Sequence, residues 1–128
     1  MKIEHIAIWV ADLEKMKEFY LTYFDLTSND KYHNPKKNFS SYFLSFQSGA
    51  RIELMYRPDI AQFIEAKTDQ VGLAHFALSV GSKKMVDQIT EKLNNNGVHI
   101  VGLPRTTGDG YYESVIADPE GNLIEITI

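Results

Sequence analysis

The alternation of apolar and polar positions divides the chain into two stretches that follow the same plan. The first stretch predicts a strand, a helix and three further strands. Asp12 is placed to cap the helix, which is expected to end near Phe24. The apolar residues that recur at helical spacing and should face the core are Leu13, Met16, Phe19, Tyr20 and Phe24. The predicted strands are residues 3–10, 26–32, 41–46 and 51–56.

A polar loop over residues 33–38 is expected before the hairpin, and Gly49 supplies the positive φ that the hairpin turn needs. Residues 57–72 contain Pro58 and show only a weak helical pattern through Ile60, Phe63 and Ile64. This segment is therefore predicted to link the two stretches.

The second stretch repeats the plan of the first. Ser82 is placed to cap its helix and Gly97 to end it. A loop rich in turn-forming residues is expected at 106–110. The apolar stripe of this helix comprises Met85, Val86, Ile89 and Leu93. The predicted strands are residues 73–80, 98–103, 111–117 and 123–128.

Spacing within the chain supports an internal repeat. Glu53 and Glu125 each follow a glycine and an isoleucine in the same pattern, and they lie 72 residues apart (125−53). His5 and His75 lie 70 residues apart (75−5), each in the first predicted strand of its stretch. The two strand–helix–three-strand units predict an α+β fold.

Composition narrows the possible classes of function. Of the 128 residues 44% are hydrophobic and 23% charged, as in ordinary globular domains. The absence of cysteine excludes disulfides and thiolate ligands. A net charge of −4 with scattered basic residues argues against a nucleic-acid partner. Apolar runs are too short for a membrane span and the chain opens directly into a strand, so a cytoplasmic protein is expected.

Strand alternation places the two histidines and two glutamates of the repeat on faces of small or polar side chains. The opposite face of each strand is bulky and apolar and suits packing against a helix. The apolar faces comprise Ile6, Ile8 and Val10; Ile52 and Leu54; Phe76, Leu78 and Val80; and Ile124, Ile126 and Ile128. The four polar side chains are therefore predicted to line one shared cup.

Two carboxylates in one cup repel each other unless a cation neutralises them. The sequence therefore predicts a divalent metal ion held by His5, Glu53, His75 and Glu125. Two imidazoles and two carboxylates suit Zn²⁺, Ni²⁺, Co²⁺ or Fe²⁺, with one or two positions left for water or substrate. Neither His33 nor His99 has a partner in the repeat, so His33 is expected on a loop surface and His99 at an exposed strand position.

Four motifs, in this order along the chain, carry a resemblance to a known family. They are Glu4-His5-Ile6-Ala7-Ile8, Ile52-Glu53-Leu54-Met55, Gly72-Leu73-Ala74-His75-Phe76-Ala77 and Asp118-Pro119-Glu120-Gly121-Asn122-Leu123-Ile124-Glu125. Together they resemble the vicinal oxygen chelate superfamily, most closely its glyoxalase I (lactoylglutathione lyase)-like branch. The likeness extends over nearly the whole chain.

The resemblance implies one domain over residues 1–128, built from βαβββ modules at 1–57 and 72–128 that are joined by a linker at 58–71. The modules would form an open, eight-stranded curved sheet around one divalent metal ion per site, commonly Ni²⁺ or Zn²⁺ in glyoxalases. The implied metal ligands are His5, Glu53, His75 and Glu125. The resemblance to short bacterial members of this branch also implies a homodimer.

The resemblance also implies a reaction. A glyoxalase I-like lyase or isomerase converts a thiol adduct of a 2-oxoaldehyde into a 2-hydroxyacyl thioester by proton transfer through a metal-bound enediolate. Glu125 would be the catalytic base, and Glu53 a metal ligand or a second proton carrier. The expected partner is thus a small carbonyl compound or its thiol adduct.

Two positions depart from the pattern of enzymes that use glutathione. Such enzymes often carry Arg four residues after the first metal His and Asn four residues after the first metal Glu, where this chain has Trp9 and Arg57. Trp9 could stack on a planar or apolar group, and Arg57 offers a fork for a carboxylate. Arg105, in a predicted loop that could cover the cup, could bind an anionic group. These three residues are the candidates for substrate binding.

The superfamily contains other functions that the sequence leaves open. An epimerase, a thiol transferase of the fosfomycin-resistance type and an extradiol dioxygenase are alternative enzymes. Glu53 counts against the transferase, which normally uses three protein ligands, and the dioxygenases are usually longer. A metal-free module of the bleomycin-resistance type would instead sequester a ligand in the same cup. The full ligand set favours a catalyst.

Overall fold

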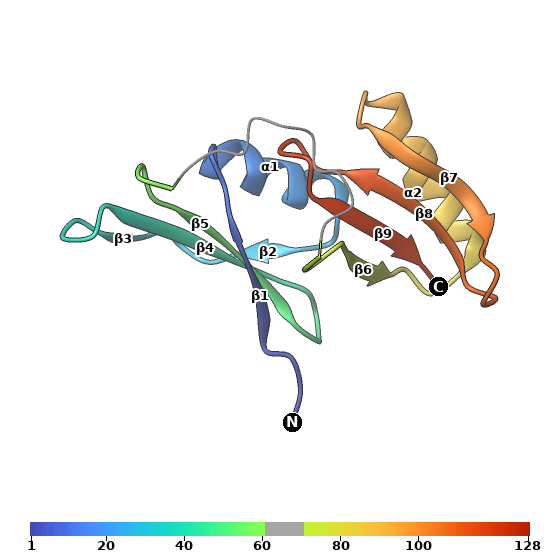
Figure 1. The fold of residues 1–128 in the computed structure, drawn as a ribbon, viewed down its shortest axis with the longest axis horizontal. Helices are drawn as coiled ribbons and strands as arrows, with labels where there is room; N and C mark the ends of the chain where they lie inside the picture. The colour runs from blue at the N-terminus through green and yellow to red at the C-terminus, as the bar shows by residue number, and fades with distance from the viewer. Residues whose placement is uncertain (61–70) are drawn as a thin grey trace. The chain divides into compact units, whose positions relative to one another are not determined.

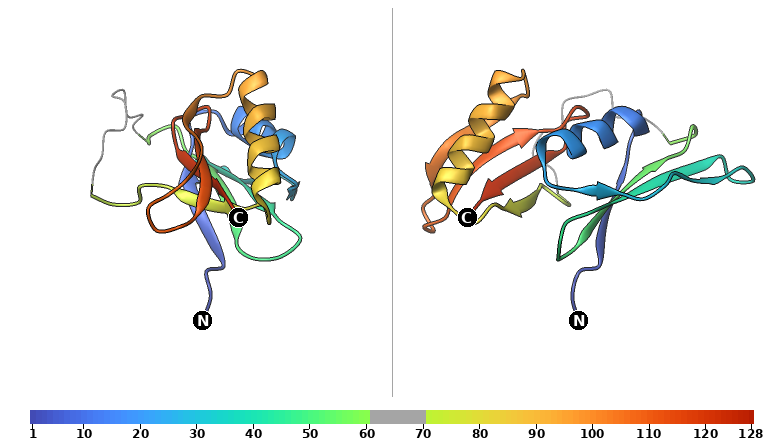
Figure 2. Two further views of the ribbon diagram at one scale, coloured as in Figure 1. Left: turned by 90° about the vertical axis from the view of Figure 1, so that its right-hand side faces the viewer. Right: turned by 180° about the vertical axis from the view of Figure 1, so that it is seen from behind.

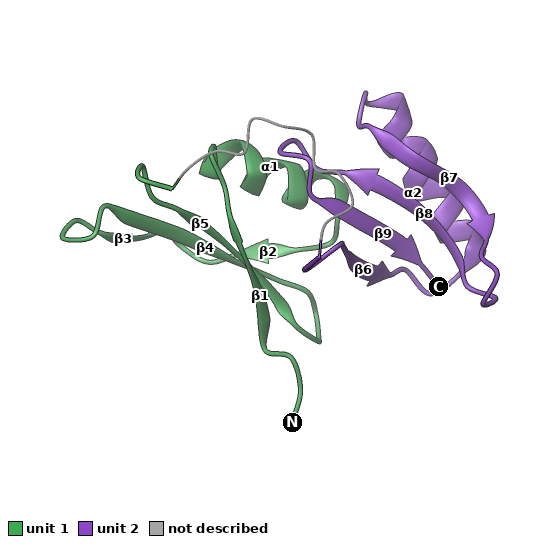
Figure 3. Cartoon of the chain, in the orientation of Figure 1, with its two compact units in different colours: residues 1–64 green, residues 65–128 purple. Residues whose placement is uncertain are grey.

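The computed structural model describes residues 1–60 and 71–128, which belong to two compact units (Figure 1, Figure 3). Unit 1 is Met1–Ile64 and unit 2 is Glu65–Ile128. In residues 1–60 and 71–128 each unit has one helix and one sheet, so the α+β class and the repeated plan are confirmed. The helical pattern expected in the linker at Phe63 and Ile64 lies outside the described residues.

The sheet of unit 1 has the strand order β1-β5-β4-β2, with β3 also paired to β4. β1 runs parallel to β5, and the other pairs are antiparallel. The elements are β1 (His5–Trp9), α1 (Leu13–Tyr23), β2 (Thr27–Ser28), β3 (Tyr32–Asn34), β4 (Phe39–Ser45) and β5 (Arg51–Tyr56).

Helix α1 begins and ends where the sequence predicts. The Asp12 side chain accepts a hydrogen bond from the backbone N–H of Lys15 at 3.0 Å, which satisfies one of the free donors of the first turn. The predicted apolar face is buried and packs on β4 and β5. Its members are Leu13, Met16, Phe19, Tyr20 and Phe24.

The long second strand predicted over residues 26–32 is wrong, because only β2 and then β3 pair with β4. Between them the Asn29 side chain accepts a hydrogen bond from the Phe43 N–H at 2.7 Å and replaces a backbone partner there. The edge strand is therefore interrupted. It resumes at Tyr32–Asn34, so the loop predicted over residues 33–38 is shorter than expected.

Unit 2 repeats the same topology, with the strand order β6-β9-β8-β7 and β6 parallel to β9. Its helix packs on one face of this sheet, mainly against β7 and β8 (Figure 2). The elements are β6 (Phe76–Ser79), α2 (Lys83–Asn95), β7 (Ile100–Thr106), β8 (Tyr112–Ala117) and β9 (Leu123–Thr127).

The ends of helix α2 are confirmed, but its buried face differs from the prediction. Ser82 caps the N-terminus by accepting from the Met85 N–H, and Gly97 follows the helix at φ +77°. The Met85 side chain is 40% exposed, so its predicted place in the core is wrong. Thr90 is buried instead, because its hydroxyl bonds to the Val86 carbonyl oxygen at 2.7 Å and lies 2.6 Å from the Ser114 hydroxyl.

The predicted loop position of Arg105 is also wrong, because β7 continues to Thr106. Arg105 pairs in register with Glu113 of β8, and their side chains form an ion pair at 3.4 Å. Pro104 is tolerated there since β7 lies at the edge of the sheet, where a missing N–H costs no ladder bond to a further strand.

Candidate metal site

The alternation that the site prediction rests on is present in all four strands. In β5 and β9 the residues flanking each glutamate are buried, while the glutamates themselves stay partly accessible. In β1 the His5, Ala7 and Trp9 positions are exposed. The buried flanks of the two glutamates are Ile52 and Leu54, and Ile124 and Ile126. His5, Glu53 and Glu125 therefore lie on the face of their sheet that the helix does not cover, while His75 directly precedes β6, which begins later than the predicted strand, at Phe76.

In unit 1 the structure brings His5 and Glu53 together. The parallel pairing of β1 with β5 sets Glu53 beside Ala7, two residues along from His5 on the same face. The His5 Nε2 lies 3.8 Å from the Glu53 Oε2, and the Glu53 side chain is only 15% exposed. One nitrogen donor and one oxygen donor thus face each other at short range.

In unit 2 the equivalent residues, His75 and Glu125, are also brought together. Glu125 pairs in register with Ala77 of β6, just as Glu53 pairs with Ala7. The His75 Nε2 lies 3.1 Å from the Glu125 Oε1, and the Glu125 side chain is 19% exposed. The repeat seen in the sequence therefore produces the same local pair twice.

The imidazole of His5 has further contacts that the sequence did not indicate. Its Nδ1 is hydrogen-bonded to the Glu4 carboxylate, whose other oxygen binds the Arg51 guanidinium. The hydrogen bond from His5, reinforced by Arg51, lowers the pKa of Glu4 below its ordinary value. The Phe43 ring meets the His5 ring edge-on at a centroid distance of 5.4 Å. His5 is therefore held from both its polar and its apolar side.

Trp9 and Arg57, the two predicted substrate contacts of unit 1, lie together. The Arg57 guanidinium lies 5.6 Å from the centroid of the half-exposed Trp9 ring and also pairs with Asp59. The Phe39 ring packs edge-on against Trp9 at 6.1 Å, and the Tyr32 ring lies at the same distance from Phe39. Register places these aromatic rings on the Glu53 face. The sequence pattern missed the contributions of Phe39 and Tyr32.

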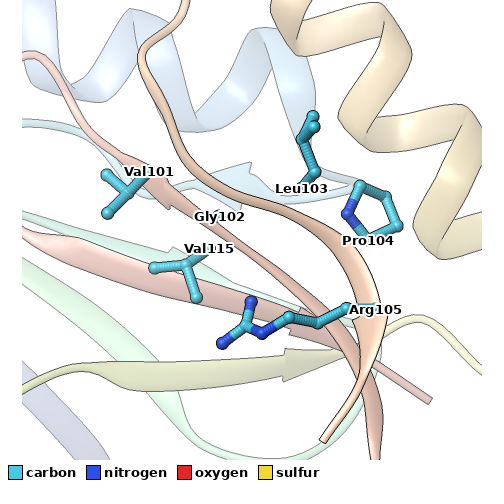
Figure 4. A pocket seen from close by; sticks show the side chains of 6 residues that line it. All are labelled: Val101, Gly102, Leu103, Pro104, Arg105 and Val115. Carbon is cyan, nitrogen blue, oxygen red and sulfur yellow. The ribbon is translucent and has the colours of Figure 1, made fainter.

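Arg105, the third predicted substrate contact, lies over a pocket of about 530 Å³ within unit 2 (Figure 4). The pocket is lined by Val101, Gly102, Leu103, Pro104, Arg105 and Val115. The Arg105 guanidinium fits there because Gly102 has no side chain. A Cβ at position 102 would come within 2.7 Å of the Arg105 Nη1. His75 and Glu125 do not line it, but Val115 is the register partner of Glu125, so the pocket borders the same sheet face.

Glu113 is a further carboxylate on the Glu125 face that the sequence did not assign. Glu113 is buried and forms an ion pair with Arg105. Register with Thr127, two residues from Glu125 on β9, places Glu113 on the face of the candidate ligand.

The two remaining histidines lie apart from these pairs within their own units. His33 is exposed but lies in β3 and not in the predicted loop, and its Nδ1 lies 2.9 Å from the Ser40 hydroxyl on the helix-covered side of β4. His99 is exposed as expected, although β7 begins one residue later, at Ile100.

The residues present suit a divalent metal ion. Each unit offers an imidazole nitrogen and a carboxylate oxygen pointing at each other, which is the donor chemistry that Zn²⁺ and Ni²⁺ accept. Within residues 1–60 and 71–128, no three His, Asp or Glu side chains are grouped so as to hold a metal ion. The set of four ligands therefore stays a prediction, assembled from two observed pairs.

Comparison with known proteins finds a relative of nearly the same length. The chain is 28% identical to the uncharacterized protein YqjT of Bacillus subtilis over 97% of this chain and 96% of the relative.

No helix in the described residues is long and apolar enough to cross a bilayer.

Solved structures show the fold. A glyoxylase/bleomycin resistance protein/dioxygenase domain from Frankia sp. EAN1pec matches with a TM-score of 0.84 and 18% identity, over 100% of this chain and 97% of that one. Glyoxalase I from Zea mays matches with a TM-score of 0.81 and 22% identity over 98% of this chain. The present chain spans 44% of the maize enzyme's length.

A sequence model of the Glyoxalase/Bleomycin resistance protein/Dioxygenase superfamily matches residues 2–126. The resemblance carried by the four motifs is thereby confirmed. The chain belongs to the Glyoxalase/Bleomycin resistance protein/Dioxygenase superfamily.

Proposed function

We propose that this protein is a metal-dependent lyase of the glyoxalase I type, which isomerises the thiol adduct of a 2-oxoaldehyde to a 2-hydroxyacyl thioester. One observation supports this proposal most strongly. Both units place an imidazole and a carboxylate together at equivalent positions, 3.8 Å apart in unit 1 and 3.1 Å apart in unit 2. A repeated nitrogen–oxygen pair is better suited to binding one cation than to stabilising the sheet, because both glutamates are largely removed from water.

In this proposal His5, Glu53, His75 and Glu125 hold one divalent ion, Ni²⁺ or Zn²⁺. When bound, the ion supplies a Lewis acid that stabilises negative charge developing on two adjacent substrate oxygens. Glu125 removes the proton from the carbon that bears the hydroxyl and sulfur, and the proton is returned to the neighbouring carbonyl carbon. The hydroxyl proton passes from the oxygen of the first carbon to the oxygen of the second. The first carbon becomes the thioester carbonyl and the second the hydroxyl carbon, so no external oxidant or reductant is needed.

The residues around these pairs define where a substrate would lie. Trp9 offers a half-exposed ring for a planar or apolar group, and Arg57 lies beside it. Arg105 is half-exposed above its pocket, where it could bind an anionic group in addition to Glu113. These contacts differ from those of glutathione-using enzymes, so the proposed thiol is not restricted to glutathione.

Metal analysis and activity reconstitution test the proposal. The purified homogeneous protein should contain close to one divalent ion per site, and the metal-stripped protein should regain turnover of methylglyoxal plus a thiol with Ni²⁺ or Zn²⁺. Glutathione and other low-molecular-weight thiols should be compared in parallel. His99→Ala serves as a matched control, since it removes an exposed histidine outside the pairs. Metal binding without turnover of any thiol adduct would contradict the lyase assignment.

The aromatic side chains on the Glu53 face favour one alternative, a module that binds a ligand without metal. Trp9 and Tyr32 are 42% and 52% exposed, respectively, and could hold an aromatic ligand. Such a module would bind its ligand equally well before and after metal removal. A glyoxalase-type enzyme would lose turnover completely in the same comparison. Size measurement in solution would test the homodimer that the resemblance implies.

A further inference from the structure

We infer that Glu4, supported by Arg51 and Phe43, fixes the His5 side chain as its Nδ1–H tautomer, whereas the matching positions around His75 carry no hydrogen-bonding side chain. His5 would thus present the free electron pair of Nε2 toward Glu53 even before a metal binds. The tautomer follows from contacts within unit 1 alone. Its consequence for metal affinity rests on the proposed function.

The hydrogen bond between Glu4 and His5 determines the tautomer. An ionised carboxylate can only accept hydrogen bonds, so the Nδ1 atom in contact with it must carry the proton. Arg51 Nη2 contacts the second oxygen of the Glu4 carboxylate, so both oxygens face donor groups. When Nδ1 carries the only ring proton, Nε2 is a lone-pair donor. This is the form of neutral imidazole that can ligate a metal through Nε2.

The Phe43 ring fixes the orientation of the imidazole as well. It meets the His5 ring at an interplanar angle of 87°, and the Arg51 guanidinium lies 4.1 Å from the centroid of the same phenyl ring. Arg51 therefore contacts both the carboxylate and the aromatic ring that hold His5. Register supports the arrangement, since Arg51 is the β5 partner of His5 and Phe43 is the β4 partner of Glu53.

The matching positions of unit 2 carry no such group. The same offsets that relate the histidines and glutamates place Ala74 (4+70), Leu123 (51+72) and Val115 (43+72) there. None of these side chains can accept or donate a hydrogen bond. The His75 Nε2 instead lies 3.1 Å from the Glu125 carboxylate, which favours a proton on Nε2 in the metal-free protein. In the metal-free protein a metal would therefore find a free electron pair on the Nε2 of His5 but a proton on the Nε2 of His75.

Nitrogen-15 NMR of the metal-free protein tests the inference directly. Long-range ¹H–¹⁵N correlation spectra, recorded at a pH where the histidines are neutral, distinguish the two tautomers of each ring. His5 should appear as Nδ1–H and His75 as Nε2–H. The signals are assigned with His5→Ala and His75→Ala variants. A wild-type His5 in the Nε2–H form would overturn the inference.

Glu4→Ala should return His5 toward the Nε2–H form, while Glu4→Gln should retain part of the Nδ1–H form because its amide oxygen still accepts a hydrogen bond. Glu18→Ala is the matched control, since it removes one exposed carboxylate on α1. An unchanged His5 tautomer in Glu4→Ala would also overturn the inference.

A competition titration with Zn²⁺ measures the consequence for the proposed metal site. Loss of a group that orients a metal-bound histidine typically weakens affinity about 10–100-fold. Glu4→Ala should show a loss in this range, and Glu18→Ala none. If His5 has the expected tautomer but the wild type binds no metal, the proposed function fails while the tautomer assignment stands. If Zn²⁺ binds and Glu4→Ala binds equally well, the positioning role fails while the proposed function stands.

Discussion

The two units share one backbone plan but surround their candidate ligands with different chemistry. In unit 1 the His5–Glu53 pair lies among aromatic rings and the Glu4–Arg51 ion pair. In unit 2 the His75–Glu125 pair is accompanied by the buried Glu113 and its partner Arg105. Sequence repetition has therefore preserved the pair itself, together with the strand register that creates it.

The helix-covered faces of the two sheets differ in the same way. In unit 1 the buried Tyr20 of α1 and Tyr42 of β4 fill this interface with aromatic rings. The equivalent positions in unit 2 are Thr90 (20+70) and Ser114 (42+72), whose hydroxyls lie 2.6 Å apart. The same backbone positions can thus be filled either by large aromatic rings or by two small hydroxyl side chains. What both solutions keep constant is the orientation of the opposite face, where the glutamates lie.

The largest expected effect separates the two glutamates. Glu125→Gln should lower kcat by about 10²–10⁴-fold, the usual contribution of a general base. Glu53→Gln should mainly weaken metal affinity and lower kcat less when the metal is saturating. Steady-state kinetics and metal content, measured on the same preparations, check this difference. Equal losses of kcat at saturating metal would mean that both carboxylates carry protons, and the functional distinction between the units would disappear.

The next effect tests whether the two cores are equivalent. Leu54 and Ile126 occupy matching positions (54+72) next to the glutamates, and both side chains are fully buried. Truncation of either to alanine should cost about 2–5 kcal/mol through lost burial and the cavity left behind. Denaturant unfolding provides the measurement.

Ile128→Ala is the control for this pair, since the side chain is 42% exposed and should change stability by less than about 0.5 kcal/mol. A large loss in only one of the two core variants would show that one unit governs the stability of the chain.

Local sequence patterns predicted the elements whose cause is local. The Asp12 and Ser82 caps, the turn at Gly49 and the strand alternation around both glutamates depend on neighbouring residues, and the structure has each of them. The histidine–glutamate pairs could be inferred as well, because the internal repeat marks them. That inference needed no knowledge of how distant strands pair.

Long-range pairing decided what the sequence could not indicate. Pro104 and the following glycines made Arg105 resemble a loop residue, yet pairing with Glu113 extends β7 through it. Consecutive strand residues normally point to opposite faces, so strand alternation did not indicate a contact between Glu4 and His5. Glu4 precedes β1, where this alternation no longer applies, and the distant Arg51 draws its carboxylate into place.

A smaller effect concerns the two proposed substrate contacts. Trp9→Ala should raise KM for an adduct with an aromatic or apolar group by up to roughly tenfold, since an aromatic contact contributes about 0.5–1.5 kcal/mol beyond burial. Arg105→Ala should raise KM only for adducts that carry a carboxylate. Kinetics with a neutral thiol and with an anionic thiol distinguish the two outcomes. If both variants affect both substrates alike, the units do not divide recognition between them.

The smallest expected effect is on how the stability of the chain depends on pH. At acid pH this dependence involves Glu14 of unit 1. The hydrogen bond from Lys31 to Glu14 is the main cause that lowers the pKa of Glu14 below 4.5, and Tyr42 also donates to this carboxylate. A depressed folded-state pKa contributes stability above the unfolded value, and that contribution is lost as the pH falls through the folded pKa. The Glu14 side chain is 57% exposed, so the contribution should stay below about 1 kcal/mol.

The alkaline side belongs to unit 2, where the Tyr112 hydroxyl donates to Asp87 of α2 at 2.7 Å. This bond raises the pKa of Tyr112 above 10.0, so its contribution is present below pH 10 and is lost as the pH rises through the folded pKa. Glu14→Gln should therefore flatten the acid limb of a stability–pH curve and leave the alkaline limb, while Asp87→Asn should do the reverse. Thermal unfolding across the pH range checks both variants against wild type. A change in the same limb for both would show that the two ion-dependent contacts do not act independently in their units.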